Sequence, residues 1–466
     1  MQIRASAAAK GSDVSGAASA VASVAASRSP RRVRVRIFHQ IDPAGVIPGG
    51  IDTFVRGLIK AAPPDIQISV VGLTTDEKQR PIGRWTALEL PGGCIDFFPV
   101  ARNRNPAGRS TIPLSLSLTL GIARYFRACA SGCDVLEFHR FEPVIPFLGD
   151  PRPKTAFVHL NMAAIHDAKS DITWKRLPGL YFALERRIVP RFASVFGVRA
   201  DAVEAYRIQY PRIAGRFRFI STWMDPDLFY PANGQRREDL RRSLQGALGL
   251  TSGHEVLMSV GRLDLQKDPM LLLESFAKVN SVRPTTRLVV VGDGVLRSTL
   301  VDRAKALGLG GRVVFTGVRG PAEVADLLQL ADAFLLSSAY EGMPMCVLEA
   351  LGCGIPVVTT TVGEVERVVH HGINGQVVQG HSPEAFARAV LELLSKREAC
   401  RGQPCTDAVR DYVPRKVLAP VYENYRRLAG RGAQLGRAST STGQSTDVHA
   451  SADSVERSDE SGRCVC

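Results

Sequence analysis

The sequence predicts an α/β protein with two doubly wound domains that face a common cleft. Three observations carry this prediction: a length of 466 residues, short apolar runs that alternate with helical patterns, and a restart of that alternation after Leu250. A chain of this length exceeds one ordinary α/β core, so two domains are expected. Hydrophobic residues make up 45% and charged residues 22% of the chain. This is enough apolar material to bury two cores without disulfides or structural metals.

The first half of the chain reads as strands separated by helices. Residues 32–38 alternate basic and apolar side chains and predict the first strand, after which Gly49 and Gly50 open a helix. A long helix is expected over residues 174–189. Further strands are expected at residues 66–71, 134–138, 155–160, 193–198 and 216–220. This alternation is typical of a mainly parallel sheet covered on both faces.

The second half repeats the pattern more clearly. Its strands are nearly continuous apolar runs, as buried parallel strands should be; they are expected at residues 256–260, 287–291, 313–316, 333–336 and 355–359. Helices are expected at residues 269–279, 296–307, 321–330 and 345–351. Residues 226–252 are rich in Pro, Gly and charge and are interpreted as the linker. Ligands in such sheets bind beyond the carboxyl ends of the strands.

Both ends of the chain are expected to be disordered. Residues 1–30 are rich in Ala and Ser, and residues 430–466 in Ser, Thr, Gly and charge, so neither can bury a core. Lys10, Asp13 and Arg28 leave no compact apolar region of the kind a secretory signal needs. A transit peptide stays open as the alternative, because the N-terminal stretch is poor in acids.

The formal net charge of +14 is compatible with nucleic acid, an anionic membrane surface or phosphorylated ligands as partners. No nucleic-acid motif accompanies the basic residues, so no nucleic-acid partner is expected. Attraction to anionic lipid head groups is the preferred functional interpretation, beside the plainer one of solvated faces. The most apolar stretch, residues 112–123, is interrupted by Pro113 and three hydroxyl residues, and no membrane span is expected.

The nine cysteines are odd in number and scattered. Neither Cys129 with Cys133 nor Cys346 with Cys353 has the paired partners of a zinc site, so no metal is expected. Reduced thiols of this kind indicate a cytoplasmic protein. The terminal Cys464 and Cys466 are compatible with lipidation or reactivity, although an inert tail is preferred.

The strongest candidate for a functional site contains two carboxylates. Glu341 follows a predicted strand, and Glu349 lies eight residues further along. If the whole interval were helical, the two would share nearly the same face, at most ~12 Å apart. Gly342 allows a tight turn, and a helix start there offers amides to an anion or to sugar hydroxyls. Two carboxylates at this spacing suit the recognition of sugar or ribose hydroxyls.

Two cations follow another predicted strand. Arg262 and Lys267 stand five residues apart, a spacing suited to gripping a diphosphate whose charge grows as a sugar–phosphate bond breaks. Two unrelated surface cations are the alternative. His159, at the end of the strand expected at residues 155–160, is compatible with a site or with a structural role, and His166 is a weaker rival.

Several blocks together resemble the large retaining GT-B glycosyltransferase family of the group 1 type. The run from Glu341 to Glu349, followed by the residues GIPVV, is similar to that family's paired-glutamate motif. The family includes bacterial lipopolysaccharide and exopolysaccharide glycosyltransferases and phosphatidylinositol mannosyltransferases. Further similar blocks are residues 224–231, 260–268, 290–294, 314–317 and 422–428. The resemblance spans about residues 32–428 and is most specific over residues 256–358.

The resemblance implies a GT-B fold: an acceptor-side Rossmann-like domain over residues 31–232, a nucleotide-sugar-binding domain over residues 233–411, and a helix over residues 412–429 that crosses back. It implies retaining transfer from a nucleoside diphosphate sugar to a glycan or lipid-linked acceptor, in surface polysaccharide biosynthesis. The donor is a substrate, and no cofactor or metal is implied. The enzyme would be cytoplasmic, peripheral at the inner face of the membrane.

The resemblance also assigns roles to individual residues. Arg262 and Lys267 would stabilise the leaving diphosphate, and Glu349 would hold the ribose. Glu341 would orient the sugar hydroxyls together with the backbone after it. His159 takes the place of a histidine near the transferred sugar. The remaining donor-side positions are Gly342, Met343, Pro344 and, across the cleft, Gly50.

Two segments depart from the family pattern. A Gly-Gly-x-Pro-Glu run is replaced by Gly363-Glu364-Val365-Glu366-Arg367, and an Asn-Gly pair before the linker by Thr222-Trp223. Both put acceptor and loop details in doubt. The alternative functions are an epimerase-like or phosphorylase-like use of sugar nucleotides, a non-catalytic sugar-nucleotide-binding protein, and a nucleic-acid-binding protein. Salt-dependent retention on DNA, against release of nucleoside diphosphate, would separate the last of these from an enzyme.

Overall fold

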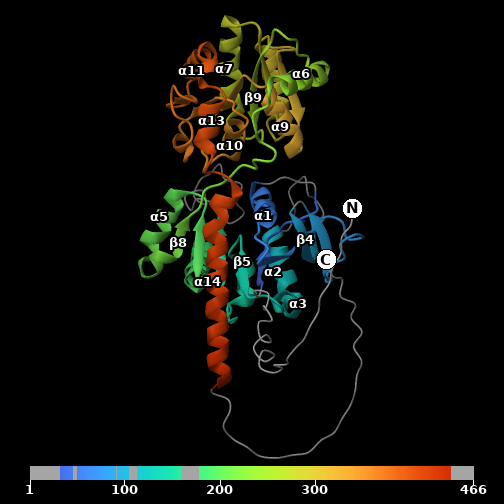
Figure 1. Cartoon of the computed structure of the whole chain (residues 1–466), viewed down its shortest axis with the longest axis vertical. Helices are drawn as coiled ribbons and strands as arrows, with labels where there is room; N and C mark the ends of the chain where they lie inside the picture. The colour runs from blue at the N-terminus through green and yellow to red at the C-terminus, as the bar shows by residue number, and fades with distance from the viewer. Residues whose placement is uncertain (1–31, 46–49, 91, 104–112, 160–177, 442–466) are drawn as a thin grey trace, which may run out of the picture.

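The computed structural model describes residues 32–45, 50–90, 92–103, 113–159 and 178–441. It has two lobes, stacked along the long axis of the molecule, and each is built on its own sheet (Figure 1). The N-terminal lobe holds an eight-stranded sheet and the C-terminal lobe a six-stranded one. The predicted class, two doubly wound α/β domains, is therefore confirmed.

The sheet of the N-terminal lobe has the order β3-β4-β2-β1-β5-β6-β7-β8. Its strands pair in parallel except for the antiparallel hairpin of β3 and β4. The strands are β1 (Val33–Phe38), β2 (Ile66–Thr74), β3 (Thr86–Leu90), β4 (Gly93–Arg102), β5 (Val135–Phe138), β6 (Lys154–Val158), β7 (Ser194–Gly197) and β8 (Phe217–Phe219). The helices are α1 (Gly50–Lys60), α2 (Leu114–Arg124), α3 (Phe126–Ala130), α4 (Pro178–Ile188) and α5 (Ala200–Gln209), with short 3-10 turns η1 (Glu142–Phe147), η4 (Val189–Arg191) and η5 (Pro211–Arg216).

The sheet of the C-terminal lobe is wholly parallel, in the order β11-β10-β9-β12-β13-β14. Its strands are β9 (Glu255–Val260), β10 (Thr286–Val291), β11 (Val313–Gly317), β12 (Ala333–Leu336), β13 (Val357–Thr360) and β14 (Gly375–Val378). Its helices are α6 (Gly234–Leu248), α7 (Pro269–Val282), α8 (Arg297–Ala306), α9 (Pro321–Leu330), α10 (Met345–Gly352), α11 (Pro383–Ser395), α12 (Arg397–Cys400) and α13 (Gln403–Val409), with the 3-10 turn η6 (Val365–Arg367).

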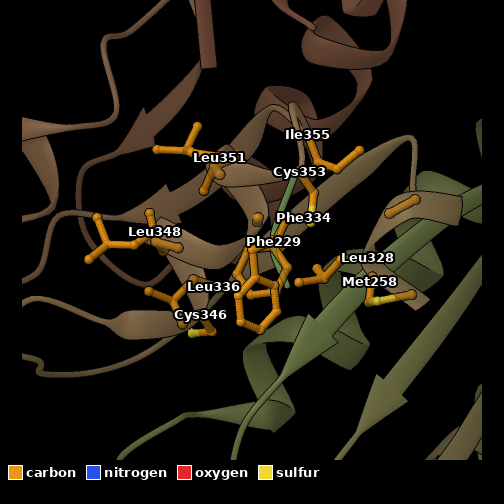
Figure 2. Packing of buried hydrophobic residues seen from close by; sticks show 14 of the residues in the cluster. Phe229, Met258, Leu328, Phe334, Leu336, Cys346, Leu348, Leu351, Cys353 and Ile355 are labelled. Carbon is orange, nitrogen blue, oxygen red and sulfur yellow. The ribbon is translucent and has the colours of Figure 1, made fainter. Parts of the chain in front are cut away.

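Each sheet is buried on both faces. In β9, Val256 and Met258 point into one apolar cluster, while Leu257 points into the other. This alternation explains the continuous apolar runs of the sequence. Figure 2 shows the first cluster, in which Phe229 packs with Met258 and Phe334. Phe229 lies before helix α6 in the chain, yet its side chain is part of the apolar core of the C-terminal lobe.

Residues 226–252, which were interpreted as the linker, contain a helix that packs on the C-terminal lobe. Helix α6 occupies most of this segment, and the side chain of Asn233 caps it by accepting a hydrogen bond from Arg236 N at 2.8 Å. Leu240, Leu244 and Leu248 recur at four-residue spacing and pack against the C-terminal core. The other faces of α6 are highly charged, so this row of three leucines was not recognised in the sequence.

The last helix, α14 (Pro414–Ser441), returns to the N-terminal lobe and packs against β1, β5 and α1 (Figure 1). Leu418, Val421, Tyr422 and Tyr425 are buried in that lobe's core, which confirms the expected crossing helix. The helix runs to Ser441, so the expectation of disorder from residue 430 onward is wrong as far as residue 441. Residues 442–466 and 1–30 lie outside the described residues.

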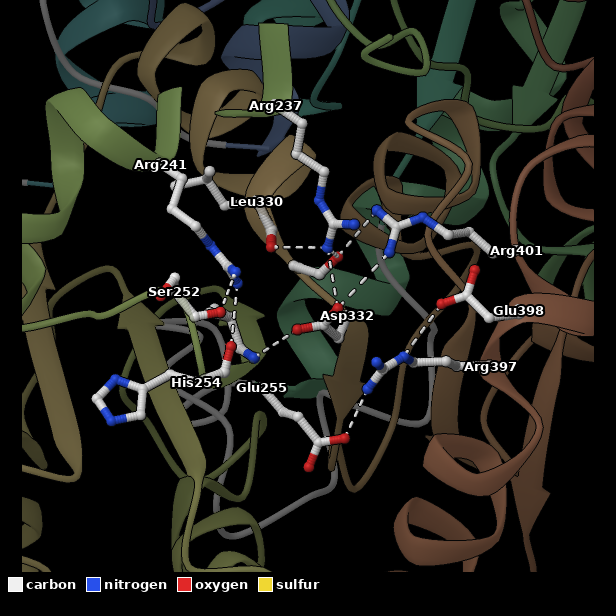
Figure 3. A network of polar contacts seen from close by, with 12 residues as sticks. Arg237, Arg241, Ser252, His254, Glu255, Leu330, Asp332, Arg397, Glu398 and Arg401 are labelled. Carbon is white, nitrogen blue, oxygen red and sulfur yellow. Dashed lines mark hydrogen bonds and ion pairs between the residues drawn. The ribbon is translucent and has the colours of Figure 1, made fainter. Parts of the chain in front are cut away.

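The basic pair Arg236 and Arg237 takes part in the packing of the C-terminal lobe. Arg237 shares Asp332 with Arg401, at 2.9 and 3.7 Å, and Arg397 contacts Glu255 at 2.6 Å (Figure 3). Asp332 also accepts a hydrogen bond from Val256 N at 2.7 Å. At the amino end of this sheet, arginines therefore contact carboxylates directly.

Candidate active site

A cleft of about 2870 Å³ separates the two lobes, at the carboxyl ends of both sheets. In each sheet the site lies where the strand order reverses, beside β1 and β5 in one lobe and beside β9 and β12 in the other. The structure brings most of the predicted site residues to this cleft: His159, Arg262, Lys267, Glu341, Gly342, Met343, Pro344 and Glu349 all line it.

Lys267 and Glu341 form the central ion pair of the C-terminal wall. Lys267 Nζ lies 2.5 Å from Glu341 Oε1, which also accepts a hydrogen bond from Ser338 Oγ at 2.8 Å. Burial opposes the charge of Lys267, but the Glu341 carboxylate outweighs it and raises the pKa of the lysine. The lysine therefore stays cationic at neutral pH and its position in the wall is fixed.

The loop that carries Glu341 is held from several sides. Ser337 Oγ donates to the carbonyl of Lys267 at 2.9 Å, and Ala339 N donates to the carbonyl of Gln266 at 2.8 Å. The loop after β9 and the loop after β12 therefore support each other. This support keeps Lys267 and Glu341 within contact distance of each other.

The segment that departs from the family pattern also supports this loop. Glu364 N donates to the carbonyl of Gly342 at 2.9 Å. Gly363 has φ +51°, and a Cβ there would lie 1.9 Å from the same carbonyl oxygen. Only glycine fits, because any side chain would displace the loop.

Glu349 lies on α10, one turn into the helix, and lines the cleft. The helix expected at residues 345–351 is confirmed as α10, which begins at Met345, so Glu341 belongs to the preceding loop and the ~12 Å limit for a wholly helical interval does not apply. Burial raises the pKa of Glu349 to about 7, although Lys267 opposes the shift. Near neutral pH this carboxyl therefore exists in both protonation states.

Arg262 lies at the rim, with its side chain 69% exposed. It contacts Asp264 at 3.0 Å and Gln266 Oε1 at 3.1 Å. The turn after β10 supports this loop, since Leu263 N donates to the carbonyl of Asp293 at 3.0 Å. Arg262 is therefore free to reorient toward a ligand, whereas Lys267 is held in place.

The N-terminal wall is built from histidines. His159 directly follows β6, and its Nε2 lies 2.9 Å from His139 Nδ1. His139 Nε2 lies 3.1 Å from Glu137 Oε1, and the hydroxyl of Tyr425 on α14 donates to the other oxygen of Glu137. His39 contacts Asp52 at 3.1 Å, and its ring centroid lies 5.3 Å from that of His139.

Burial sets the protonation of this wall. It lowers the pKa values of His39, His139 and His159, and it raises the pKa of Glu137 to about 8. The histidines are therefore neutral at pH 7. The two walls thus differ at their centres, where the C-terminal wall has an ion pair and the N-terminal wall has neutral histidines, although Asp52 and Arg199 also line the N-terminal wall.

Sequence reasoning missed His39, His139, Glu137 and Asp52. The signal that located His159 also applies to two of them, because His39 directly follows β1 and His139 directly follows β5. Gly50 opens α1, whose next residues Ile51 and Asp52 line the cleft. Gly49 and His166 lie outside the described residues.

Two contacts join the walls. Arg199 Nη1, from the N-terminal lobe, donates to the carbonyl of Glu341 at 2.6 Å. Thr222 Oγ1, part of the second departure from the family pattern, donates to the carbonyl of Met343 at 3.0 Å. Its neighbour Trp223 packs on Phe54 with ring centroids 4.4 Å apart, and Phe54 meets His159 edge-on at 5.1 Å.

Within the described residues, no group of three or more His, Cys, Asp or Glu side chains is arranged to hold a metal ion. The seven described cysteines are free thiols, and all but Cys94 are buried.

Comparison with known proteins agrees with this architecture. The family model for group 1 glycosyl transferases matches residues 241–403. A D-inositol 3-phosphate glycosyltransferase from Corynebacterium urealyticum is 31% identical over 391 residues, covering 81% of this chain and 88% of the relative. Another, from Rhodococcus erythropolis, is 34% identical over 389 residues, covering 78% of this chain and 84% of the relative.

Two solved structures share the fold. Sucrose-phosphate synthase from Thermosynechococcus elongatus aligns with a TM-score of 0.65 and 20% sequence identity, over 88% of this chain and 100% of that one. HepE from Anabaena, in complex with UDP and glucose, aligns with a TM-score of 0.60 and 16% identity, over 88% and 100%. Two Rossmann-like lobes around a cleft, with a last helix that returns to the first lobe, define the GT-B class of glycosyltransferases. The chain belongs to the group 1 glycosyltransferases, as its motifs predicted.

Proposed function

We propose that the protein is a retaining glycosyltransferase that moves a sugar from a nucleoside diphosphate sugar to a glycan or lipid-linked acceptor, in surface polysaccharide biosynthesis. The observation that carries this proposal is the pair of Lys267 and Glu341, 2.5 Å apart, on the same wall as Glu349 and facing His159 across one cleft. A cation for the diphosphate and carboxylates for hydroxyls are thereby placed together.

The C-terminal wall suits a nucleotide-sugar donor. HepE was solved with UDP and glucose, and starch synthase IV from Arabidopsis thaliana, which has the same fold, with ADP and acarbose. In the proposed complex Lys267 and Arg262 contact the diphosphate, Glu349 accepts hydrogen bonds from the ribose hydroxyls, and Glu341 accepts from the sugar. Arg262, exposed at the rim, closes onto the phosphates.

The proposed reaction replaces one bond of the anomeric carbon by another on the same face of the sugar. The bond to the phosphate oxygen breaks, and its electron pair leaves with the diphosphate, where Lys267 and Arg262 stabilise the growing charge. The acceptor hydroxyl oxygen forms the new bond and its proton passes to the departing phosphate oxygen. His159, neutral at pH 7, orients the sugar and acceptor without adding charge.

The N-terminal wall supports an acceptor that has an apolar part. Pro113, Leu116, Ile145 and Leu184 line this side of the cleft. A lipid-linked acceptor would cover them while its hydroxyl reaches His159. Within the described part of the chain, no helix is both long and apolar enough to cross a bilayer. We therefore propose a cytoplasmic enzyme that reaches such an acceptor from an anionic membrane surface, to which the basic residues of the N-terminal lobe attach it.

A small phosphorylated polyol is the second candidate acceptor. Two relatives are named D-inositol 3-phosphate glycosyltransferases. Arg140 lines the acceptor side of the cleft, and its buried Nε has no hydrogen-bond partner among the described residues. A phosphate on the acceptor would satisfy that donor.

The test is a panel of UDP-, GDP- and ADP-sugars assayed for release of the nucleoside diphosphate. Each donor is offered with inositol phosphate or with a membrane lipid extract, and the anomeric configuration of the product is read by NMR. Release with one donor and an unchanged anomeric configuration supports the proposal. An inverted product would overturn the retaining mechanism, and an epimerised donor without release would favour the epimerase-like alternative. Retention on DNA that is lost at high salt, without nucleotide release, would favour nucleic-acid binding.

A further inference from the structure

A second pocket lies at the opposite end of the N-terminal sheet from the cleft. It has a volume of about 400 Å³. Lys154 begins β6 on this side, and His159 follows β6 on the cleft side, so the two pockets lie at opposite ends of one strand. The charged residues that line it are Asp150, Arg152, Lys154, Arg191, Arg216 and Arg427.

The centre of this pocket is a buried lysine. Lys154 is 4% exposed, and its Nζ donates to the carbonyls of Asp150 and Arg152, at 2.5 and 3.1 Å. Asp150 is the single carboxylate among the described lining residues, and Arg152 holds it through Nε at 2.9 Å and through a second contact. Arg152 thus contacts the carboxylate, whereas Lys154, Arg191 and Arg216 line the same pocket beside it.

Neutral backbone oxygens hold the surrounding arginines. Arg191 donates to the carbonyl of Leu148 at 2.8 Å, and Arg216 donates to those of Pro190 and Phe192, at 3.1 and 2.9 Å. These contacts fix the guanidinium groups without compensating their charge. At the same edge of the C-terminal sheet, Arg241 is also held by backbone carbonyls, but Arg237, Arg397 and Arg401 contact the carboxylates of Asp332, Glu255 and Glu398 (Figure 3).

We propose that this pocket binds a phosphate group, carried either by a free phosphorylated molecule or by an anionic lipid head group. Several guanidinium groups that converge from different elements match the oxygens of a phosphate better than the single plane of a carboxylate. An anion in the pocket would compensate the positive charge of the lining cations that Asp150 alone does not balance. Neither the donor nor the acceptor proposed above uses this pocket.

The test compares two variants with the same change of charge. Arg216→Gln removes a lining cation, whereas Arg218→Gln removes an exposed cation on β8 outside the pocket. Hydrogen exchange of the full chain is measured with pyrophosphate as the probe, because peptides report the pocket and the cleft separately. We expect protection at residues 148–156, weakened about tenfold in affinity by Arg216→Gln, since a charge-assisted hydrogen bond contributes about 1.5 kcal/mol or more. Arg218→Gln should bind pyrophosphate with the affinity of the wild type.

A second arm distinguishes the source of the phosphate. Sedimentation with phosphatidylglycerol vesicles at low salt is measured for the same two variants. Lower retention of Arg216→Gln alone assigns the pocket to a lipid head group, and equal retention with weakened pyrophosphate binding assigns it to a free phosphorylated molecule. The proposal is overturned if protection by pyrophosphate is confined to peptides of the cleft, or if Arg218→Gln behaves as Arg216→Gln in both arms.

An independent observation concerns the hydrogen-bond chain behind His159. Of its four members, His159 lines the cleft, while His139, Glu137 and Tyr425 are buried. With an ionised Glu137, His139 donates to it from Nε2 and accepts from His159 at Nδ1, which leaves the proton of His159 on Nε2. With a neutral Glu137 that donates to His139, both hydrogen bonds of His139 reverse and His159 carries its proton on Nδ1, while Tyr425 still donates to Glu137.

The geometry points to Glu137 and His139 as positioning residues that decide which nitrogen of His159 holds the proton. Tyr425 fixes Glu137 from the returning helix α14, so the segment that ends the second lobe is tied to a residue of the first lobe's wall. This inference rests on the proposed role of His159 in the transfer reaction. It requires no contact between Glu137 and the substrate.

The test uses the ¹⁵N NMR signals of the His159 ring, which report the tautomer whether or not the protein is active. Measured above pH 8, where Glu137 of the wild type is ionised and a glutamine cannot be, Glu137→Gln should change the tautomer distribution of His159 and lower kcat about tenfold, with the KM for the donor unchanged. Glu185→Gln is the matched control: Glu185 is buried in the same lobe and is bound by two tyrosine hydroxyls, Tyr206 and Tyr210, at 3.4 and 3.2 Å.

Tyr425→Phe should produce a smaller change of the same signals, because Glu137 keeps its contact with His139. Unchanged ¹⁵N signals in Glu137→Gln would overturn the positioning role. A changed tautomer with unchanged kcat would instead overturn the proposed role of His159, so the two failures are distinguishable.

Discussion

The two walls of the cleft differ in the charge of their central residues. On the C-terminal wall, Lys267 is kept charged by Glu341, and the exposed Arg262 is available at the rim. On the N-terminal wall, burial keeps His139 and His159 neutral. A fixed charge such as that of Lys267 suits a diphosphate, and neutral polar side chains such as those of the histidines suit hydroxyl groups that must exchange a proton. The predictions below test this division, beginning with the largest expected effect.

Removal of the buried cation should have the largest effect on activity. In Lys267→Ala the diphosphate loses its fixed partner, and Glu341 is left with its charge uncompensated. We expect kcat/KM for the donor to fall by about 10³-fold, in the range found for loss of a preorganised electrostatic group. Steady-state release of the nucleoside diphosphate measures it.

The control for that variant is Lys305→Ala, because Lys305 lies on the exposed face of α8. Its kinetics should match those of the wild type. An equal loss in both variants would mean that overall charge, rather than the cleft, attracts the donor.

The opposite wall should affect turnover more than donor affinity. His159→Ala removes the group that faces the sugar, and we expect kcat to fall about 10²-fold while the KM for the donor changes little. Kinetics at varied donor concentration separate the two constants. His254→Ala serves as the control, because His254 directly precedes β9 and does not line the cleft, so its kinetics should match those of the wild type. A large rise in the KM for the donor in His159→Ala would contradict the proposed division of roles between the two walls.

Donor affinity should depend on pH through the C-terminal wall. Burial raises the pKa of Glu349 to about 7, and the ribose hydroxyls require its ionised form. As pH falls from 8 to 6, Glu349 gains a proton and the Kd for the nucleoside diphosphate should rise, by at most about tenfold per pH unit. Calorimetric titration at several pH values shows it. Glu349→Gln should bind more weakly with a flatter profile, and an equally steep profile would remove Glu349 from the ribose site.

The smallest effect is on stability, through the N-terminal wall. Burial raises the pKa of Glu137 to about 8, so the folded protein retains a proton that the unfolded chain has released above pH 4.5. The folded state therefore binds more protons, and the contribution of Glu137 to stability declines as pH rises from 4.5 to about 8. Above pH 6.5 the histidines are neutral in both states and no longer offset this decline.

Thermal unfolding between pH 6.5 and 8.5 measures this contribution. Glu137→Gln should show a smaller fall of Tm over that range than the wild type. The exposed Glu238→Gln should retain the full fall, and an unchanged slope in Glu137→Gln would contradict a raised pKa.

The strands β9 to β13 of the C-terminal lobe were predicted more clearly than the strands of the N-terminal lobe, although strand β14 and helices α11 to α13 of the C-terminal lobe were missed. Its strands are apolar on both faces, so a plain run such as residues 333–336 defines β12 without knowledge of its neighbours. The edge hairpin of β3 and β4 was missed, because β3 is only half-buried and its sequence, Thr-Ala-Leu-Glu-Leu, has no strong strand signal. The domain boundaries and the roles of the site residues stay predictions.

The same difference applies to the site. The residues of the C-terminal wall fall into two short motifs, one with Arg262 and Lys267 and one with Glu341 and Glu349, so each pattern was visible although the contact between Lys267 and Glu341 was not. The chain of His159, His139 and Glu137 joins the ends of two strands to Tyr425, which lies 288 residues from Glu137. Contacts over such distances arise from the fold, and a lone histidine after a strand does not indicate them.

The central claim, that the C-terminal wall holds the donor and the N-terminal wall serves the acceptor, is tested most directly by calorimetric titration of UDP, GDP and ADP. One of these nucleotides should bind the wild type and His159→Ala with similar affinity, and should bind Lys267→Ala at least about tenfold more weakly. Loss of binding in His159→Ala, with binding to Lys267→Ala unchanged, would contradict the account.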